Sequence, residues 1–291
     1  MTEYALFLGC TIPAREPNYE LSARKALTKL GIELVDLENM TCCAPPPIQS
    51  IDLETSLSIA AYNICLAEEA GLNIVTLCSG CFESLTIANA VLKENEKLRA
   101  RVNQILSNVG KEFKGNKEVK HYLQVLINNI GLNRLKKSVS KDLSKLKVAS
   151  FSGCHMLRPS ALLKFDDPER PQFFDNLIEA LGAKSIWYRN KAKCCGGLLR
   201  GYADDVALAI ARDKIVNATK AGADCLVTIC PFCFLTLDLG QVLIKATFKE
   251  EYSMPVLHYS ELLSLSLGVD PKELALEFHK MRLDNVLNKI G

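Results

Sequence analysis

The sequence lacks an excess of charge of either sign and lacks any long uncharged apolar run. Its 291 residues carry a net charge of +2, which is not the balance of a nucleic-acid-binding chain. No uncharged apolar stretch approaches the ~18 residues of a membrane-spanning helix, and residues 1–10 have no basic segment typical of a signal peptide. No glycine-rich phosphate loop follows the first apolar run of either half, so we expect no flavin or nicotinamide site. These absences favour a cytoplasmic globular protein.

Cysteine, by contrast, is abundant. The chain has 12 cysteines. A disulfide framework suits a small secreted chain without a core, but 48% of these residues are hydrophobic, which is enough for a buried core and two domains. In a reducing compartment, so many cysteines indicate metal binding or catalysis.

Ten of the cysteines form an internal repeat. Each half contains a lone cysteine, an adjacent Cys-Cys pair and, after a gap of 34 residues, a closing Cys-x2-Cys. The pair and the closing motif recur at a constant offset of 152 residues. The first set is Cys10, Cys42, Cys43, Cys78 and Cys81, and the second is Cys154, Cys194, Cys195, Cys230 and Cys233. Independent structural cysteines would rarely keep such spacing, so the chain is predicted to be a tandem repeat.

The surrounding pattern predicts an α/β fold. Apolar runs typical of buried strands precede each lone cysteine and each Cys-x2-Cys, and helix-like stretches that end at glycines lie between them. We therefore expect two pseudo-repeated domains, each a small parallel sheet flanked by helices, with the cysteines at the carboxyl ends of the strands and facing the domain interface. The predicted domains are residues 1–142, with a helical insertion at 83–118, and residues 143–291. The Lys-rich stretch 136–147 is expected to be a solvated linker.

The residue types favour a polynuclear metal group. Thiolates are soft ligands that suit zinc or iron–sulfur clusters. Five cysteines per repeat exceed the four that saturate tetrahedral zinc, which favours clusters, although zinc in one site stays an alternative. A thioredoxin-type dithiol would leave the other six repeated cysteines unexplained. Cys65 and Cys225 have no counterpart in the other half and are expected in the core.

The cysteine pattern resembles the cysteine-rich CCG domain family over nearly the whole chain. The compact tandem, with the segments 151–159 (FSGCHMLRP) and 194–197 (CCGG), is similar to the B subunits of heterodisulfide reductases from methanogenic archaea. One departure is Ala44, which stands where the family has a glycine after the first pair. The prolines at 45–47 are expected to make a stiff, non-helical turn there.

The resemblance implies a function in methanogenesis. A protein of this kind reduces the mixed disulfide of coenzyme M and coenzyme B to two thiols, by one-electron steps at two noncubane 4Fe-4S clusters. The five cysteines of each repeat would hold one cluster. The implied partners are a ferredoxin-like C subunit and a flavin-containing A subunit of the same reductase, with a hydrogenase or a formate dehydrogenase in the larger complex as the source of electrons.

Fewer residues can be predicted for the rest of the site. His155, next to Cys154, is a candidate proton donor to a leaving thiolate, or else a structural histidine beside the ligand. The implied substrate carries a sulfonate, a phosphate and a carboxylate, which favour a cationic pocket. The candidate substrate-binding residues are Arg158, Lys191, Lys193 and Arg200. Of the other histidines, His121 and His258 are expected to be structural, and His279 is expected on the surface of the last helix.

Two other function classes stay open. The chain could be an electron-transfer subunit of another oxidoreductase, of the lactate, glycolate or succinate type, which would bind no heterodisulfide. It could also be a zinc-stabilised interaction scaffold, which would be colourless.

Overall fold

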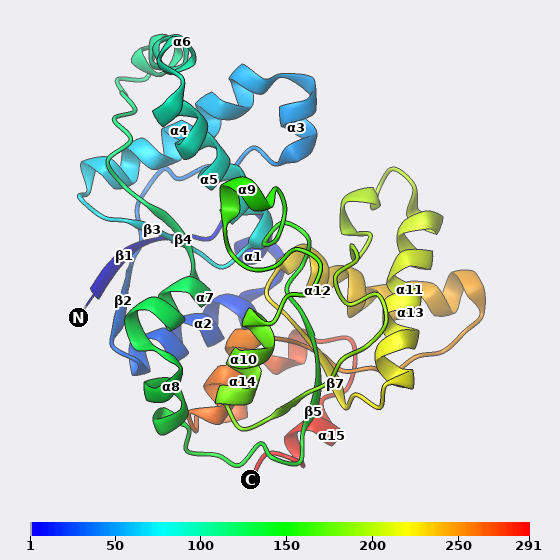
Figure 1. Cartoon of the computed structure of the whole chain (residues 1–291). Helices are drawn as coiled ribbons and strands as arrows, with labels where there is room; N and C mark the ends of the chain where they lie inside the picture. Colours follow the sequence, from blue (N-terminus) through cyan, green and yellow to red (C-terminus); the bar gives the residue numbers. More distant parts are fainter. Residues whose placement is uncertain (1) are drawn as a thin grey trace.

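The structure, a computed structural model, describes residues 2–291 and contains two parallel sheets of four strands (Figure 1). The first sheet has the order β2-β1-β3-β4 and the second has the order β6-β5-β7-β8, with every pair parallel. The strands are β1 (Thr2–Phe7), β2 (Ile32–Val35), β3 (Ile74–Thr76), β4 (Val119–His121), β5 (Lys147–Phe151), β6 (Lys184–Ser185), β7 (Cys225–Thr228) and β8 (Val256–His258). The matching strand orders confirm the predicted pseudo-repeat.

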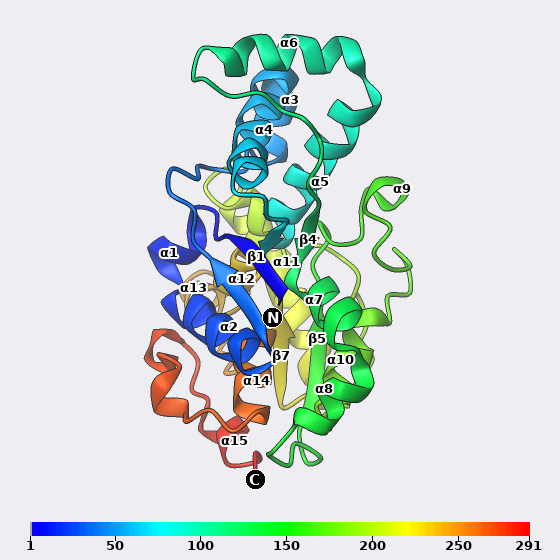
Figure 2. The same ribbon diagram turned by 90° about the vertical axis from the view of Figure 1, so that its left-hand side faces the viewer.

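Helices connect the strands of the first half. They are α1 (Thr11–Arg15), α2 (Pro17–Lys29), α3 (Pro46–Ile51), α4 (Leu53–Glu69), α5 (Ser79–Glu94), α6 (Glu96–Ser107), α7 (Tyr122–Val125), a π-helical turn (Leu126–Ile130) and α8 (Leu132–Ser138). The predicted insertion corresponds to most of α5, to α6 and to the loop that follows. Figure 2 shows that these helices, with α3 and α4, form one end of the molecule.

The second half repeats this plan with shorter elements. Its helices are α9 (Ser160–Leu163), α10 (Phe173–Ala180), a 3₁₀ turn (Gly197–Leu199), α11 (Asp204–Lys220), α12 (Pro231–Leu237), α13 (Leu239–Phe248), α14 (Tyr259–Ser266), two further 3₁₀ turns (Pro271–Glu273 and Leu276–Phe278) and α15 (Asp284–Leu287). The connection between the halves runs from the end of α8 to the start of β5, and the predicted boundary at 142/143 lies within it.

The prediction for the prolines after the first cysteine pair was wrong. Pro45 is extended, but Pro46 begins α3. A proline is tolerated in the first turn of a helix because its missing N–H would have no partner within the helix at that position.

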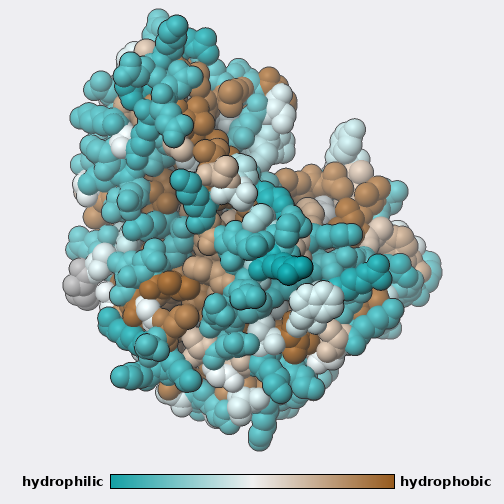
Figure 3. Space-filling model, in the orientation of Figure 1, coloured by the Kyte–Doolittle hydropathy of each residue, from teal (hydrophilic) through white to brown (hydrophobic). Residues whose placement is uncertain are grey.

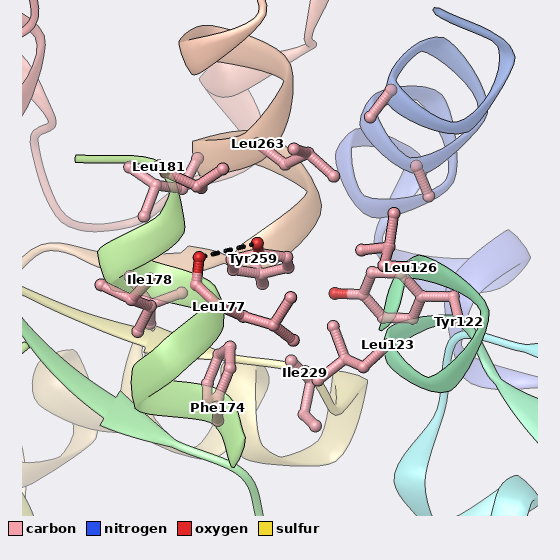
Figure 4. Packing of buried hydrophobic residues seen from close by; sticks show 14 of the residues in the cluster. Tyr122, Leu123, Leu126, Phe174, Leu177, Ile178, Leu181, Ile229, Tyr259 and Leu263 are labelled. Atoms are coloured by element: carbon pink, nitrogen blue, oxygen red, sulfur yellow. Dashed lines mark hydrogen bonds between the residues drawn. The ribbon is translucent and has the colours of Figure 1, made fainter. Parts of the chain in front are cut away.

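The two halves share their hydrophobic core. Buried residues from both sheets belong to each of the two core clusters. Figure 4 shows Tyr122 and Leu123 of the first half across from Leu177 and Tyr259 of the second, with Ile229 between them. The Tyr259 hydroxyl donates to the Leu177 carbonyl at 3.2 Å. Because one core spans the interface, the relative position of the two sheets is set by packing as well as by the linker.

The strand order determines where each sheet can bind a ligand. In the order 2-1-3-4, the second strand lies on one side of the first strand and the third strand lies on its other side. The connections therefore run toward opposite edges of the sheet, and the crevice opens between the first and third strands at their carboxyl ends. Cys10 follows β1 and Cys78 follows β3, while Cys154 and Cys230 follow β5 and β7. The predicted place of the cysteines, at the carboxyl ends of the strands, is confirmed.

One stretch is long and apolar enough to cross a membrane. It is Pro231–Phe248, which covers α12 and α13, and half of that stretch is buried inside the protein. Core helices pass the same test of length and composition, so this is weak evidence for a span. Figure 3 shows apolar surface on the right-hand lobe, where Figure 1 places α11 and α13, and a hollow between this lobe and that of α3, α4 and α6.

Candidate metal centre

All ten repeated cysteines line one cavity. Its volume is about 750 Å³ with the open mouth included, and its other lining residues are Leu8, Thr11, Pro45, Pro46, Gly80, His155, Gly197, Leu198, Pro231 and Phe232. Pro45 and Pro46 lead into α3, and Leu198 precedes α11, so the cavity lies between the two lobes. Cys65 and Cys225 are buried elsewhere in the core and do not line it.

Helix starts present several of these thiols. Cys10, Cys78 and Cys230 are the N-cap residues of α1, α5 and α12. The N-terminus of a helix carries partial positive charge and unpaired N–H groups, which stabilise thiolates. A glycine precedes each lone cysteine, and a Cβ atom on Gly9 (φ +69°) would lie 2.8 Å from Cys81 Sγ. A Cβ at position 9 would collide with the sulfur of Cys81, so the turn before Cys10 needs a glycine.

The two cysteine pairs are followed by left-handed residues. Gly196 has φ +86°, and Ala44, at the equivalent place, has φ +52°. In the second pair, the N–H groups of Gly196 and Gly197 lie 3.3 Å from the sulfurs of Cys194 and Cys195. These donors favour the thiolate form. Ala44 therefore adopts a left-handed backbone despite its Cβ, like the residue that follows the pair in the other half.

The thiols form an almost continuous series across the interface. Within the first set, Cys42, Cys43, Cys81 and Cys78 interact in turn, and Cys78 interacts with Cys230 of the other half. From Cys230 the series continues to its own set, in the order Cys233, Cys195, Cys194 and Cys154. Cys10 is exposed and acts on Cys42 only through its charge. The cavity therefore brings both sets together at the pair Cys78 and Cys230.

Because of these interactions, some thiols have a lowered pKa and others a raised pKa. Interaction with Cys42 and Cys81 lowers the pKa of Cys43 to about 4. Interaction with Cys154 and Cys195 lowers the pKa of Cys194 to about 2, and the Gly196 N–H contributes. The pKa of Cys195 is raised to about 12, chiefly by Cys194. Each half thus holds a thiolate at neutral pH, which is the form that binds a metal.

A single tyrosine joins the two Cys-x2-Cys turns. The Tyr19 hydroxyl, on α2, lies 2.5 Å from the Leu77 carbonyl and 3.0 Å from the Ile229 carbonyl, and these residues directly precede Cys78 and Cys230. Tyr19 is fully buried. One hydroxyl between two equivalent carbonyls holds the turns of both halves at a fixed separation. The cysteine pattern contains no signal for this residue.

His155 lines the cavity and is held from the other half. Its Nδ1 contacts a carboxylate oxygen of Glu83, on α5. Burial alone would lower the pKa of His155, but the Glu83 carboxylate outweighs it and raises that pKa above its ordinary value. The contact orients the ring and leaves Nε2 as the nitrogen that Glu83 does not engage. Glu83 was not predicted; its only sequence signal is its place two residues after Cys81.

The four predicted cations do not line the cavity. Arg158 contacts Glu169 and the carbonyls of Pro168 and Ala192. Lys191 pairs with Asp175, and both belong with Lys193 to a separate surface groove. Arg200 pairs with Asp204 at 3.2 Å in a hollow that adjoins the cavity at Gly197 and Phe232. Their role as substrate-binding residues stays a prediction, with Arg200 the nearest candidate.

Two of the other histidines are structural, as expected, and one is not where it was predicted. His121 and His258 are fully buried and cap α7 and α14. Burial lowers the pKa of His121 to about 4 and that of His258 to about 3. The prediction that His279 lies on the surface was wrong: its side chain is 2% exposed and lies 2.8 Å from Glu261. The segment that carries His279 packs against α14, where Glu261 lies, and the side chain of His279 is buried there.

The donors fit an iron–sulfur group better than a single ion. Within residues 2–291, no three histidine, cysteine, aspartate or glutamate side chains are close enough to hold one metal ion. Instead, five thiols from each half surround one cavity, and N–H donors approach two of the sulfurs. A cluster with several irons can use five thiolates and accept such N–H groups.

Comparisons with known proteins agree with this donor set. The cysteine-rich domain CCG matches residues 4–86 and 148–238. The chain belongs to this family. It is 41% identical to the B subunit of the ferredoxin:CoB-CoM heterodisulfide reductase of Methanosarcina mazei, over 100% of this chain and 97% of that protein. A second relative is the "8-methylmenaquinol:fumarate reductase membrane anchor subunit" of Wolinella succinogenes, 36% identical over 94% of this chain and 95% of that one.

A solved structure shares the fold of this CCG protein. A hypothetical protein from Helicobacter pylori has a TM-score of 0.81 at 16% identity, over 97% of this chain and 52% of that one. At such low identity the likeness concerns the fold alone. The family and the reductase relatives together support an iron–sulfur electron-transfer subunit that works within an oxidoreductase complex.

Proposed function

We propose that this chain is the subunit of a reductase complex that reduces the heterodisulfide of coenzyme M and coenzyme B. The observation that carries the proposal is the single cavity lined by ten thiols, five from each repeat. The similarity to a Methanosarcina protein named for that activity, over the full length of the chain, supports the choice of substrate. The proposal extends to two noncubane 4Fe-4S clusters, one per domain, with the domains at residues 1–142 and 143–291.

The chemistry requires two electrons and two protons. One disulfide plus two electrons and two protons gives two thiols, so the S–S bond breaks and each sulfur gains an electron and a proton. Bound clusters would supply the electrons one at a time. In our proposal the thiolates of the first set hold one cluster and those of the second set hold the other, and the disulfide enters between them.

The chain's own residues serve the protons and the geometry. His155 stands beside Cys154 at the cavity, and Glu83 holds its Nδ1, so its Nε2 is the atom from which a proton would pass to a leaving sulfur. Tyr19 holds the turns of Cys78 and Cys230 together. The largely apolar lining, with Leu8, Leu198 and Phe232, would exclude water from the reacting sulfurs.

The proposal includes the partners that the family resemblance implies. Electrons would come from a ferredoxin-like C subunit and a flavin-containing A subunit, fed by a hydrogenase or a formate dehydrogenase, in the cytoplasm. The name of the Methanosarcina relative includes ferredoxin, which supports a one-electron donor.

A specific observation favours a second candidate function. No lysine or arginine lines the cavity in the part of the chain that the structure describes, and the Wolinella relative belongs to a fumarate reductase. The chain could therefore serve an oxidoreductase of the succinate type, passing electrons without binding an anionic disulfide. A zinc-stabilised scaffold is the third candidate.

The first test is the iron, acid-labile sulfide and zinc content of the chain purified without oxygen. About eight irons and eight sulfides per chain are expected for two four-iron clusters. One or two zincs without sulfide would contradict the cluster proposal. The next test adds the heterodisulfide to the iron-loaded protein and monitors binding through changes in the visible spectrum of the protein. Full iron content without a spectral response to the disulfide would favour the electron-transfer function instead.

A further inference from the structure

A buried lysine lies behind the second cysteine pair. Lys214, on α11, is 1% exposed. Its Nζ donates to the carbonyls of Asn190 at 3.0 Å and Lys191 at 3.2 Å, and it lies 3.9 Å from the centre of the Phe151 ring. Carbonyls and rings are uncharged, and within residues 2–291 no carboxylate approaches this Nζ within 4.0 Å. An ammonium buried without a counter-charge is costly, so its place needs an explanation.

The negative groups that act on Lys214 are the thiols of the second set. Burial lowers its pKa to about 8, and the charges of Cys195, Cys233 and Cys194 raise it, in that order, ahead of Asp213. Asp213 is exposed and hydrogen-bonded to Asn190 and Asn217. At neutral pH the ammonium is therefore still mostly charged. Of the three thiols, Cys194 is ionised at this pH, because its pKa is lowered to about 2, and a bound metal group would deprotonate the other two as well, so the second set supplies the negative charge that acts on Lys214.

The first half has an uncharged residue in the same place. Helices α4 and α11 both contain 17 residues and are both followed by Ala-Gly, so Lys214 corresponds to Asn63. The Asn63 side chain accepts from the Thr41 N–H at 2.7 Å and donates to the Cys42 carbonyl at 3.0 Å. Both residues therefore hold the loop that carries the cysteine pair. Only Lys214 adds a charge.

We propose that Lys214 is a positioning residue that makes the second cysteine set the stronger electron acceptor of the two. A positive charge stabilises the more negative, reduced state of a nearby redox group, and net charge is one of the properties that set cluster potentials. The inference rests on the proposed function, since it requires a redox group in each half. It adds a direction: an electron shared between the two groups resides on the group of Cys154, Cys194, Cys195, Cys230 and Cys233.

The test is a redox titration of the iron-loaded full chain, followed by electron paramagnetic resonance. Lys214→Gln keeps an N–H donor for the loop but removes the charge, and it should lower the higher of the two midpoint potentials so that the two converge. Lys214→Arg keeps the charge and should keep the two potentials apart. Lys220→Gln removes the same charge from the exposed end of the same helix and should shift neither. Two potentials unchanged by Lys214→Gln, or lowered equally, would overturn the inference.

The metal analysis keeps this test separate from that of the proposed function. Iron and sulfide in the chain, together with two midpoint potentials that do not respond selectively to Lys214→Gln, would overturn the inference and leave the cluster assignment standing. Absence of iron and sulfide from the unmodified chain would overturn the proposed function and, with it, the inference that rests on it.

Discussion

The two halves of the chain place equivalent cysteines after equivalent strands, but they surround them with different polar groups. Asn63 of the first half corresponds to Lys214 of the second, and Ala44 corresponds to Gly196. The lone cysteine also differs, since Cys10 is exposed while Cys154 is partly buried and interacts with Cys194. The repeat therefore conserves ligand positions and varies the electrostatics and strain around them. Two metal groups held by equivalent cysteines would therefore lie in different electrostatic surroundings.

The helices that follow the last strands show the same contrast. His121 and His258 cap α7 and α14, and the residue three positions later accepts from the backbone N–H of the histidine. That residue is the neutral Gln124 in the first half and Glu261 in the second. Glu261 is fully buried and also contacts His279 and Asn18, both at 2.8 Å. The neutral cap residue of the first half is thus replaced, in the second half, by a residue that belongs to a buried ionic network.

The largest expected effect comes from removing one thiol of each closing motif. Cys81→Ser and Cys233→Ser should each cost the redox group of their own half, so that the iron content falls to about half in either variant, because serine is a poor ligand for iron in clusters. Iron analysis and the resonance spectrum of the group that remains would measure this. Because Cys78 and Cys230 meet, a single shared group is the rival outcome, and loss of all iron in either variant would favour it.

The next effect concerns the ionic network of the second half. Burial alone would raise the pKa of Glu261, but His279, with smaller contributions from His258 and Asn18, lowers it by more. The pKa of His279 is raised, chiefly by Glu261, against the effect of burial. A carboxyl group whose pKa is lower in the folded protein stabilises the fold at pH values above its unfolded-state pKa. This stabilisation is lost as the pH falls through the folded-state pKa. A histidine whose pKa is higher in the folded protein stabilises the fold at pH values below its unfolded-state pKa. This stabilisation is lost as the pH rises through the folded-state pKa. The pair therefore contributes most near pH 5–6.

Glu261→Gln imitates the first half and should destabilise the protein by about 2–3 kcal/mol at pH 5.5, and by less at pH 9. Urea unfolding at the two pH values measures the difference. Gln124→Ala is the matched control, because it removes a neutral cap and should cost about 1 kcal/mol at both pH values. Equal losses at both pH values for Glu261→Gln would mean that the pair is not ionised.

A third effect, of a size similar to the second, comes from the turn after the second cysteine pair. A Cβ atom on Gly196 would lie 2.6 Å from the Ala207 carbonyl oxygen, and the φ of +86° is unfavourable for alanine. Gly196→Ala should therefore destabilise the protein by about 2–4 kcal/mol, measured by urea unfolding. Gly222→Ala is the control, since Gly222 has φ +78° with no atom near its Cβ, and strain alone should cost about 1–2 kcal/mol. Equal losses would show that the contact with Ala207 is relieved.

The difference between what could and could not be predicted from the sequence has a physical cause. Cysteine spacing, apolar runs and terminal glycines are local patterns, and they predicted the parallel sheets and the convergence of ten thiols on the strand ends. Tyr19, Glu83 and Lys214 act on the site through contacts with residues distant in the sequence, up to 210 positions away for Tyr19. Apart from the closeness of Glu83 to Cys81 in the sequence, no local pattern marks these residues, because their neighbours are set by the packing of separate segments on one another. His279 was misplaced for the same reason: Glu261, which contacts it in the interior, lies on a different helix.

The smallest effect is expected where the first half departs from the family. Ala44→Gly relieves a left-handed alanine, worth about 1–2 kcal/mol, but it loses a buried methyl worth about 0.8 kcal/mol and gains about 0.4–1 kcal/mol of unfolded-state entropy. These terms nearly cancel, so the free energy of unfolding should change by less than about 1 kcal/mol. Ala70→Gly, at φ −74°, relieves no strain and should destabilise by about 0.5–1 kcal/mol.

The helix opposite this turn explains why we expect glycine and alanine to be exchangeable after the first cysteine pair but not after the second. Ser56 corresponds to Ala207, and its hydroxyl donates to the Ala44 carbonyl at 3.2 Å, whereas the backbone of Ala207 closes on Gly196. The first half thus has room for a Cβ at the position where the second half has none. A change above about 1.5 kcal/mol for Ala44→Gly, in either direction, would mean that this turn is packed as tightly as its counterpart. In that case the halves would differ in charge but not in packing.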